Sequence, residues 1–143
     1  MKHEPMTESQ IEALGLLQPG IYDFTIAEAE EQKSKKGNDM FKLILHVFEE
    51  NGKPRKIYDW VMPSFPKKYK HLHDALGILD IYAKGETTTD DLKGKSGKLS
   101  LGIGEPRTDN NGIERVNNTV IDYVKKDNVD SYGAKNLDDD IPF

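Results

Sequence analysis

Alternating apolar and polar residues predict two strands in the first third of the chain. Within residues 19–30 the period is two, and one apolar face is made by Tyr22, Phe24 and Ile26. Within residues 40–50 the odd positions are all apolar, namely Phe41, Leu43, Leu45 and Val47. A period of two is typical of a strand with one buried face. Both segments should therefore pack these faces on one core, with residues 31–39 as a lysine-rich loop between them.

A third strand is predicted at residues 55–62, because Asn51-Gly52 is a favoured hairpin dipeptide and the chain should return antiparallel. In one register Ile57 and Val61 point inward, and three residues then share the outer face: Lys56, Tyr58 and Trp60. The opposite register would reverse the two faces and bury the aromatic rings. The pattern leaves both registers open.

After Ser64, a candidate N-cap, the apolar spacing changes to steps of four and three. The apolar positions are Phe65, Tyr69, Leu72, Leu76, Leu79 and Ala83. This spacing predicts one helix packed on the sheet, with Gly77 as a stop or break.

The remaining pattern predicts a loop at residues 85–97 and strands at 98–104 and 117–126, the last with a slipped register between Val120 and Tyr123. Three strands, one helix and two strands follow the order of the OB-fold, a mainly β, five-stranded Greek-key barrel. We therefore expect that barrel, with one helix between its third and fourth strands.

The domain prediction has three parts: an arm at residues 1–18, the barrel at 19–126 and a flexible acidic tail at 127–143. The tail has little apolar content and several turn residues.

The amino-acid composition excludes several kinds of chemical site. The chain has no cysteine, which excludes disulfides, thiolate zinc sites and cysteine nucleophiles. The sequence shows no run of 18 apolar residues and no signal-peptide pattern, so we expect a cytoplasmic protein.

The net charge of -5 is unevenly distributed. The arm holds one lysine and three glutamates, and the tail holds one lysine and five aspartates. The remaining residues, 19–126, carry 18 basic and 17 acidic side chains. The excess of acidic residues thus lies at the two ends of the chain, and the barrel itself can bind an anionic partner.

Basic residues of the barrel gather in loops and at element edges, with aromatic residues between them, which is typical of single-strand binding. The candidate DNA-binding residues are Lys33, Lys35, Lys36, Lys42, Phe48, Lys53, Arg55, Lys56, Tyr58, Trp60 and Lys67. No basic recognition helix is evident, so we expect single-stranded DNA as the partner. A sequence- or structure-specific binder of RNA or duplex DNA is the alternative.

Signals of an enzyme are weak. On a helix, His71 and His73 would diverge by about 200° and could not share a metal. Asp23, Glu31 and Lys33 faintly resemble the spacing of magnesium nucleases, which is the less favoured alternative. We expect no enzyme activity, no catalytic residue, no metal and no cofactor.

Three segments resemble a family of OB-fold single-stranded-DNA-binding proteins from tailed phages of enterobacteria. They are "SKKGNDMFKLIL" at 34–45, "YDWV" at 58–61 and "LKGKSGKLSLGI" at 92–103. The resemblance implies that the loop of Ser34, Lys35, Lys36, Gly37 and Asn38 lies beside the binding groove, which adds Asn38 to the candidate DNA-binding residues. It also implies a role in phage DNA replication, recombination and repair.

The final residues "DDDIPF" are similar to the terminal hexapeptide of bacterial single-stranded-DNA-binding proteins, which docks replication and repair enzymes. The resemblance implies a docking peptide made of Asp138, Asp139, Asp140, Ile141, Pro142 and Phe143. Its apolar residues would fill a pocket on a host or phage partner, and its aspartates would meet a basic rim.

Overall fold

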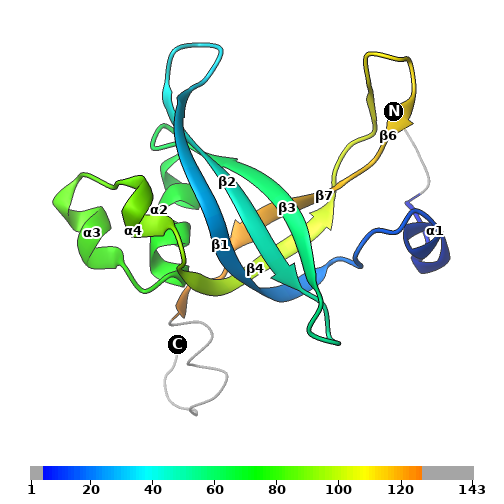
Figure 1. Ribbon diagram of the computed structural model, residues 1–143, viewed down its shortest axis with the longest axis horizontal. Helices are drawn as coiled ribbons and strands as arrows, with labels where there is room; N and C mark the ends of the chain where they lie inside the picture. Colours follow the sequence, from blue (N-terminus) through cyan, green and yellow to red (C-terminus); the bar gives the residue numbers. More distant parts are fainter. Residues whose placement is uncertain (1–4, 127–143) are drawn as a thin grey trace.

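A computed structural model describes residues 5–126 of the chain and shows a mainly β protein (Figure 1). A five-stranded antiparallel sheet curls into a half-barrel and is accompanied by short helices. The sheet strands are β1 (Gly20–Lys33), β2 (Asp39–Phe48), β3 (Pro54–Val61), β4 (Ser96–Ile103) and β7 (Asn118–Tyr123). The short strands β5 (Arg107–Thr108) and β6 (Glu114–Arg115) form a separate hairpin. The helices are α1 (Glu8–Ala13), α2 (Pro66–Ala75), α3 (Leu79–Lys84) and α4 (Thr89–Leu92).

The order of the sheet is β3-β2-β1-β4-β7, with every neighbouring pair antiparallel. The long strand β1 pairs with β2 as far as its end, whereas only its first part pairs with β4. Its register with β2 shifts between Ile26 and Glu28. Such an irregularity increases the local bend of a strand, which allows β1 to serve both halves of the curled sheet.

The inward faces agree with the periodicity of the sequence. Phe24 and Ile26 are buried on β1, and the four odd positions predicted on β2 are buried as well. On β3, Ile57 and Val61 point into the core. The register that turns the aromatic residues of β3 outward is therefore confirmed.

The loop expected at residues 31–39 is shorter than predicted. Glu31, Gln32 and Lys33 still pair with β2, so the connection covers only residues 34–38. Pairing gives these polar residues backbone hydrogen-bond partners, which outweighs their weak preference for strands.

The prediction of a single helix is wrong, because the described chain has three helices between β3 and β4. Gly77, with φ of 74°, separates α2 from α3, as expected of a break. Ser64 is not the N-cap, since Phe65 occupies that position. The helix α4 lies inside the expected loop, where the side chain of Thr88 and that of Asp91 form a capping box.

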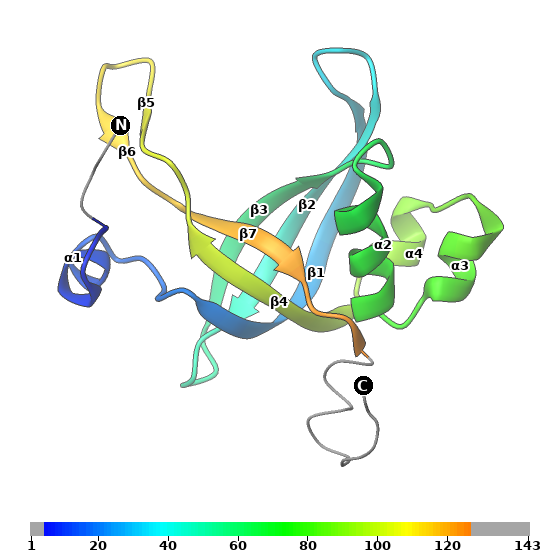
Figure 2. The same ribbon diagram turned by 180° about the vertical axis from the view of Figure 1, so that it is seen from behind.

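The three helices cover one end of the half-barrel, as both views show (Figures 1 and 2). The approach is closest at Gly97 of β4, where an added Cβ would lie 2.6 Å from the carbonyl oxygen of Ala75 at the end of α2. No helix in residues 5–126 is long and apolar enough to span a membrane.

The last strand has the slipped register that the sequence predicts. Val120 and Tyr123 are both buried, and the pairing of β4 with β7 shifts at Ile121, which lies between the paired residues Val120 and Asp122. The β5–β6 hairpin, by contrast, is absent from the predicted elements.

The N-terminal arm is held against the sheet. Asn118 of β7 accepts a 2.9 Å hydrogen bond from the backbone N–H of Leu17 and donates one of 2.9 Å to its carbonyl. The side chain of Leu17 belongs to the core. Residues 127–143, with the candidate docking residues 138–143, lie outside the described residues.

Candidate nucleic-acid interface

The outer face of β3 carries the candidate stacking residues. Because side chains alternate along a strand, Lys56, Tyr58 and Trp60 point outward together. Tyr58 is 44% exposed and Trp60 is 49% exposed. Their ring centroids lie 6.4 Å apart with an interplanar angle of 24°, so the two flat faces are nearly parallel.

The neighbouring strand β2 adds a cation to this face. Lys42 pairs with Trp60 in register, and its ammonium lies 5.5 Å from the centroid of the Tyr58 ring. Ile44 is opposite Tyr58, and His46 is opposite Lys56. The outer surface of the β2–β3 hairpin therefore places flat rings beside positive charge.

A groove follows this face on the side away from β2, and we call it the β3 groove. Its volume is about 410 Å³. One wall is β3, and the other is the connection between β4 and β7. Its polar and aromatic lining includes Arg55, Lys56, Tyr58 and Trp60 on one side and Glu105, Arg107, Asn117 and Thr119 on the other. Cations and hydrogen-bonding side chains thus line the groove on both sides.

The second wall was not predicted, although the sequence contains a signal for it. Asn111-Gly112 is the same hairpin dipeptide that predicts the β2–β3 turn. In the structure, Asp109 accepts hydrogen bonds from the backbone N–H groups of Asn111 (2.9 Å) and Ile113 (3.0 Å), and from Nε of Arg115 (2.7 Å). The bond from Arg115, followed by that from Ile113, lowers the pKa of Asp109. The hairpin beside the groove is therefore internally braced.

The β1–β2 loop holds Lys35 and Lys36 exposed at its tip. The backbone N–H of Ser34 donates to the carbonyl of Asn38 (2.8 Å), and the N–H of Asn38 donates to Oγ of Ser34 (3.1 Å). In Figure 1 this loop and the β5–β6 hairpin project from the same side of the half-barrel. The turn geometry thus presents two cations on the side to which the hairpin also points.

The other candidate residues are more dispersed. Lys33 forms an ion pair with Asp39, so part of its charge is neutralised. Phe48 and Lys53 lie at the β2–β3 turn, the opposite end of the hairpin from the β1–β2 loop. Lys67 is exposed at the start of α2.

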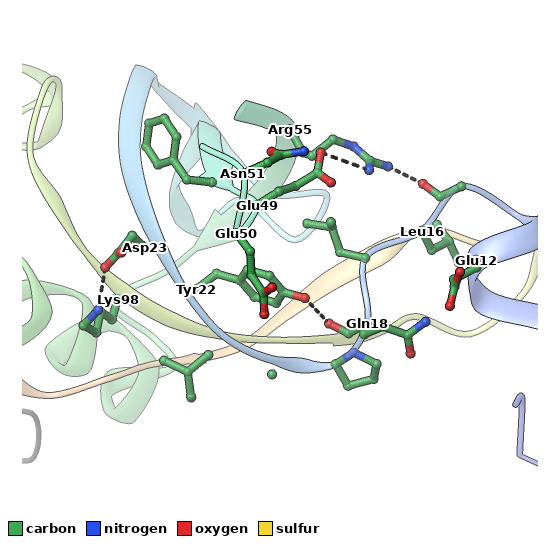
Figure 3. A pocket seen from close by; sticks show the side chains of 16 residues that line it. Glu12, Leu16, Gln18, Tyr22, Asp23, Glu49, Glu50, Asn51, Arg55 and Lys98 are labelled. Atoms are coloured by element: carbon green, nitrogen blue, oxygen red, sulfur yellow. Dashed lines mark hydrogen bonds and ion pairs between the residues drawn. The ribbon is translucent and has the colours of Figure 1, made fainter. Parts of the chain in front are cut away.

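Arg55 lines both the β3 groove and a larger hollow of about 1030 Å³, which is shown in Figure 3. Its guanidinium donates to the carbonyl of Gly15 and lies 3.6 Å from Oε2 of Glu49. Burial and the charges of Glu50 and Glu49 raise the pKa of Tyr22 in this hollow. A cavity rich in carboxylates repels phosphate, so the smaller β3 groove is the better nucleic-acid site.

A buried polar cluster lies directly behind the β3 groove, where the free edges of β3 and β7 face each other. We call this line the β3–β7 seam. Asp59 accepts hydrogen bonds from the hydroxyl of Tyr123 (2.7 Å) and from Nζ of Lys68 (3.1 Å), and Lys68 also donates to the carbonyl of Val120 (3.1 Å). Burial raises the pKa of Asp59, partly opposed by the charge of Lys68. Burial also raises the pKa of Tyr123 well above its ordinary value, with the charge of Asp59 adding to it.

The residues of the nuclease alternative are separated. Asp23 and Glu31 are eight residues apart on β1, about 26 Å along an extended strand, so they cannot share one metal ion. Asp23 instead pairs with Lys98 at 2.6 Å. Residues 5–126 contain no group of three side chains of His, Asp or Glu placed to hold a metal.

Neither helical histidine faces the groove. Nδ1 of His71 lies 2.9 Å from a carboxylate oxygen of Asp122. His73 is fully buried, with Nδ1 donating to the carbonyl of Tyr69 and Nε2 bonded to Oγ1 of Thr87, both at 2.8 Å.

By architecture the protein is a mainly β protein with a curled five-stranded sheet. Its residues 5–82 match the family described as "Protein of unknown function (DUF669)", and the chain belongs to that family. The match includes β3 with its outward aromatic pair, whereas the β4–β7 wall of the groove lies beyond it. No curated protein matches the chain.

Proposed function

We propose that the protein binds single-stranded DNA in the β3 groove with little sequence preference. The observation that carries this proposal is the half-exposed, nearly parallel pair of Tyr58 and Trp60 beside Lys42 and Lys56. Every base has a flat face that can stack on an aromatic ring, and the adjoining phosphates interact with lysine and arginine. Stacking of this kind requires unpaired bases, which favours a single strand over a duplex.

We also propose that the half-barrel is an OB-fold. The sheet order supports this assignment, as do the β3–β7 seam and the position of the helices between β3 and β4. In OB-folds the face of the second and third strands binds oligonucleotides, together with the loops after the first and fourth strands. The corresponding parts here are the β2–β3 face, the β1–β2 loop and the β4–β7 connection. These are the parts that carry the aromatic residues and the exposed loop lysines described above.

In this proposal the protein is a non-enzymatic binder in the cytoplasm of a bacterial host. It protects single-stranded DNA during phage replication, recombination and repair. The segment from Asp138 to Phe143 docks replication, recombination and repair proteins. Similarity of that segment to known docking peptides supports this role.

A competition titration tests the function, with displacement of a labelled mixed-sequence oligonucleotide as the readout. Unlabelled poly-dT and mixed single strands should displace the label equally, whereas RNA and duplex DNA of equal concentration should displace it weakly. Equal displacement by RNA or by duplex would contradict the proposal. Incubating the same DNA with magnesium and the protein tests the nuclease alternative directly, and we expect the strand to remain intact.

The fluorescence of Trp60 gives an independent reading, because it is the single tryptophan of the chain. A base stacked on its indole should quench the emission. Binding without any change in this signal would place the DNA elsewhere on the surface.

A further inference from the structure

A third hollow carries two of the most exposed apolar side chains of the described residues. Phe65 is 66% exposed and Ile121 is 61% exposed. The hollow has a volume of about 370 Å³ and is lined by Phe65, Pro66, Lys67, Lys68, Ile121 and Asp122. We call it the Phe65 hollow. The helical spacing of the sequence includes Phe65, but the structure leaves this ring exposed at the N-cap of α2.

This hollow continues the β3 groove. Thr119 lines the groove and Ile121 lines the hollow, and the two are exposed residues on the same strand, β7. They are separated only by buried Val120, a spacing of about 7 Å along a strand. The two hollows are therefore neighbours along the exposed face of β7.

Lys68 connects the Phe65 hollow to the seam. Lys68, which lines the Phe65 hollow, reaches from α2 to Asp59 on β3 and to the carbonyl of Val120 on β7. Its side chain is 29% exposed, so its ammonium contributes some positive charge to the surface at this point.

The rim of the Phe65 hollow suits a phosphate. Lys67 is exposed and forms no ion pair with another described residue. The carboxylate of Asp122 is the opposing charge, but it is turned to Nδ1 of His71 at 2.9 Å. A flat ring and an exposed ammonium at one site are the combination that Tyr58 and Lys42 form on the outer β2–β3 face.

We propose that single-stranded DNA bound in the β3 groove continues along the seam into the Phe65 hollow, where Phe65 stacks a further base and Lys67 contacts a phosphate. This inference rests on the proposed function and extends its footprint to the start of α2. Proximity to the groove and the exposed charge of Lys67, which pairs with no other described residue, favour nucleic acid over an apolar protein partner at this surface.

Two oligonucleotide lengths test the extension, one of about 4 nucleotides and one of about 16, the ends of the range for one OB-fold. Phe65→Ala should weaken binding of the longer strand by about 5-fold or more, the lower end of the loss of one stacked base. It should leave binding of the shorter strand unchanged. Phe65→Tyr should restore the affinity, because it restores a ring. Leu14→Ala, on the arm and 55% exposed in the wild type, is the matched control and should change neither affinity.

A tryptophan at position 65 would report directly on DNA binding in the Phe65 hollow. In the double variant Trp60→Phe with Phe65→Trp, the only tryptophan lies in the Phe65 hollow, and the longer strand should quench it. Two results together would contradict the extension: DNA quenches Trp60 in the wild type but not the reporter, and Phe65→Ala binds both lengths normally. Binding in the β3 groove would then still stand. If the wild type binds neither strand, the proposed function itself fails.

Discussion

The hydroxyl of Tyr123 on β7 donates a 2.7 Å hydrogen bond to the carboxylate of Asp59 on β3, although these strands are not paired in the described sheet. Side chains thus connect the two free edges of the half-barrel. Because Asp59 lies between Tyr58 and Trp60 in sequence, this bond also fixes the segment of β3 that presents both rings. The stability of the fold and the geometry of the candidate site depend on the same contact.

Replacing Tyr123 with Phe should reduce the free energy of unfolding by about 1–3 kcal/mol, because a buried carboxylate loses one hydrogen-bond donor. Urea unfolding followed by circular dichroism measures this change. Tyr82→Phe is the control, since the hydroxyl of Tyr82 makes no hydrogen bond with another described residue. Equal stability of Tyr123→Phe and the wild type would show that the seam does not depend on this bond.

Stability should fall as the pH falls below about 6.5, the ordinary pKa of histidine. Burial lowers the pKa of His73, partly opposed by its bond to the carbonyl of Tyr69 and by the charge of Asp91. Below about pH 6.5 the unfolded chain therefore binds a proton at this histidine, whereas the native protein does not. The free energy of unfolding falls as the pH decreases further, until His73 is protonated in the native protein as well.

Comparison with His73→Phe isolates this effect, because the variant keeps a ring but cannot titrate. Its free energy of unfolding should depend less on pH between about 6.5 and 5, by up to about 1.4 kcal/mol for each pH unit. The quantity to compare is the slope, since Phe at this position also leaves Thr87 without its partner. Identical slopes in the two proteins would exclude His73 as the titrating group.

Trp60→Ala should weaken the binding of single-stranded DNA by about 1–3 kcal/mol, the loss expected for one stacked base. Trp60→Phe should retain most of the affinity, because the flat face remains. Fluorescence anisotropy of a labelled oligonucleotide provides the measurement. Both variants should fold, since Trp60 is half exposed, and thermal unfolding checks that point. Unchanged affinity in a folded Trp60→Ala variant would rule out the β3 groove.

Removing Lys35 and Lys36 together by substitution with Ala should reduce the salt dependence of binding. At about 0.7 for each phosphate contact on a single strand, the slope of log affinity against log salt should become shallower by about 1.4. The matched control removes Lys84 and Lys95, which are exposed residues among the helices. If both double variants have the same slope, the β1–β2 loop does not contact phosphates.

Deleting residues 127–143 should raise DNA affinity at low salt, because it removes five aspartates and one lysine that can compete for the cationic groove. The effect should be clear where the Debye length is about 30 Å and small above about 0.15 M salt.

Deleting Phe143 alone should abolish binding to docking partners and leave DNA affinity nearly unchanged, because all three aspartates of the peptide remain. Pull-downs with the two forms compare their partners. Recovery of the same proteins by the intact chain and by the Phe143 deletion would contradict the docking role.

The strands could be predicted because each has one face on the core, and that constraint imposes a period of two, as in Leu43 and Leu45. The outward direction of Trp60 followed from the same rule once Ile57 was placed inside. Phe65 fits the helical apolar spacing of the sequence, yet it precedes the helix at the N-cap. Helical periodicity does not apply to a residue outside the helix.

The second wall of the groove could not be found by looking for apolar patterns. The β5–β6 hairpin buries little, and its only local signal is the turn dipeptide with Asp109 before it. The seam was also beyond prediction, because it brings Asp59 next to Tyr123 across 64 positions of sequence. Contacts of that kind depend on how the sheet curls, which a local pattern does not encode.

The close approach at Gly97 limits how this protein can change during evolution. A side chain there would meet the backbone oxygen of Ala75 at 2.6 Å, and backbone cannot rotate away as a side chain can. Any larger residue would displace α2, the helix that supplies Lys68 to the seam. We therefore expect only glycine at position 97 as long as α2 packs on the sheet in this position. The adjoining residues, Ser96 and Lys98, face outward, so substitutions are expected to be tolerated better there.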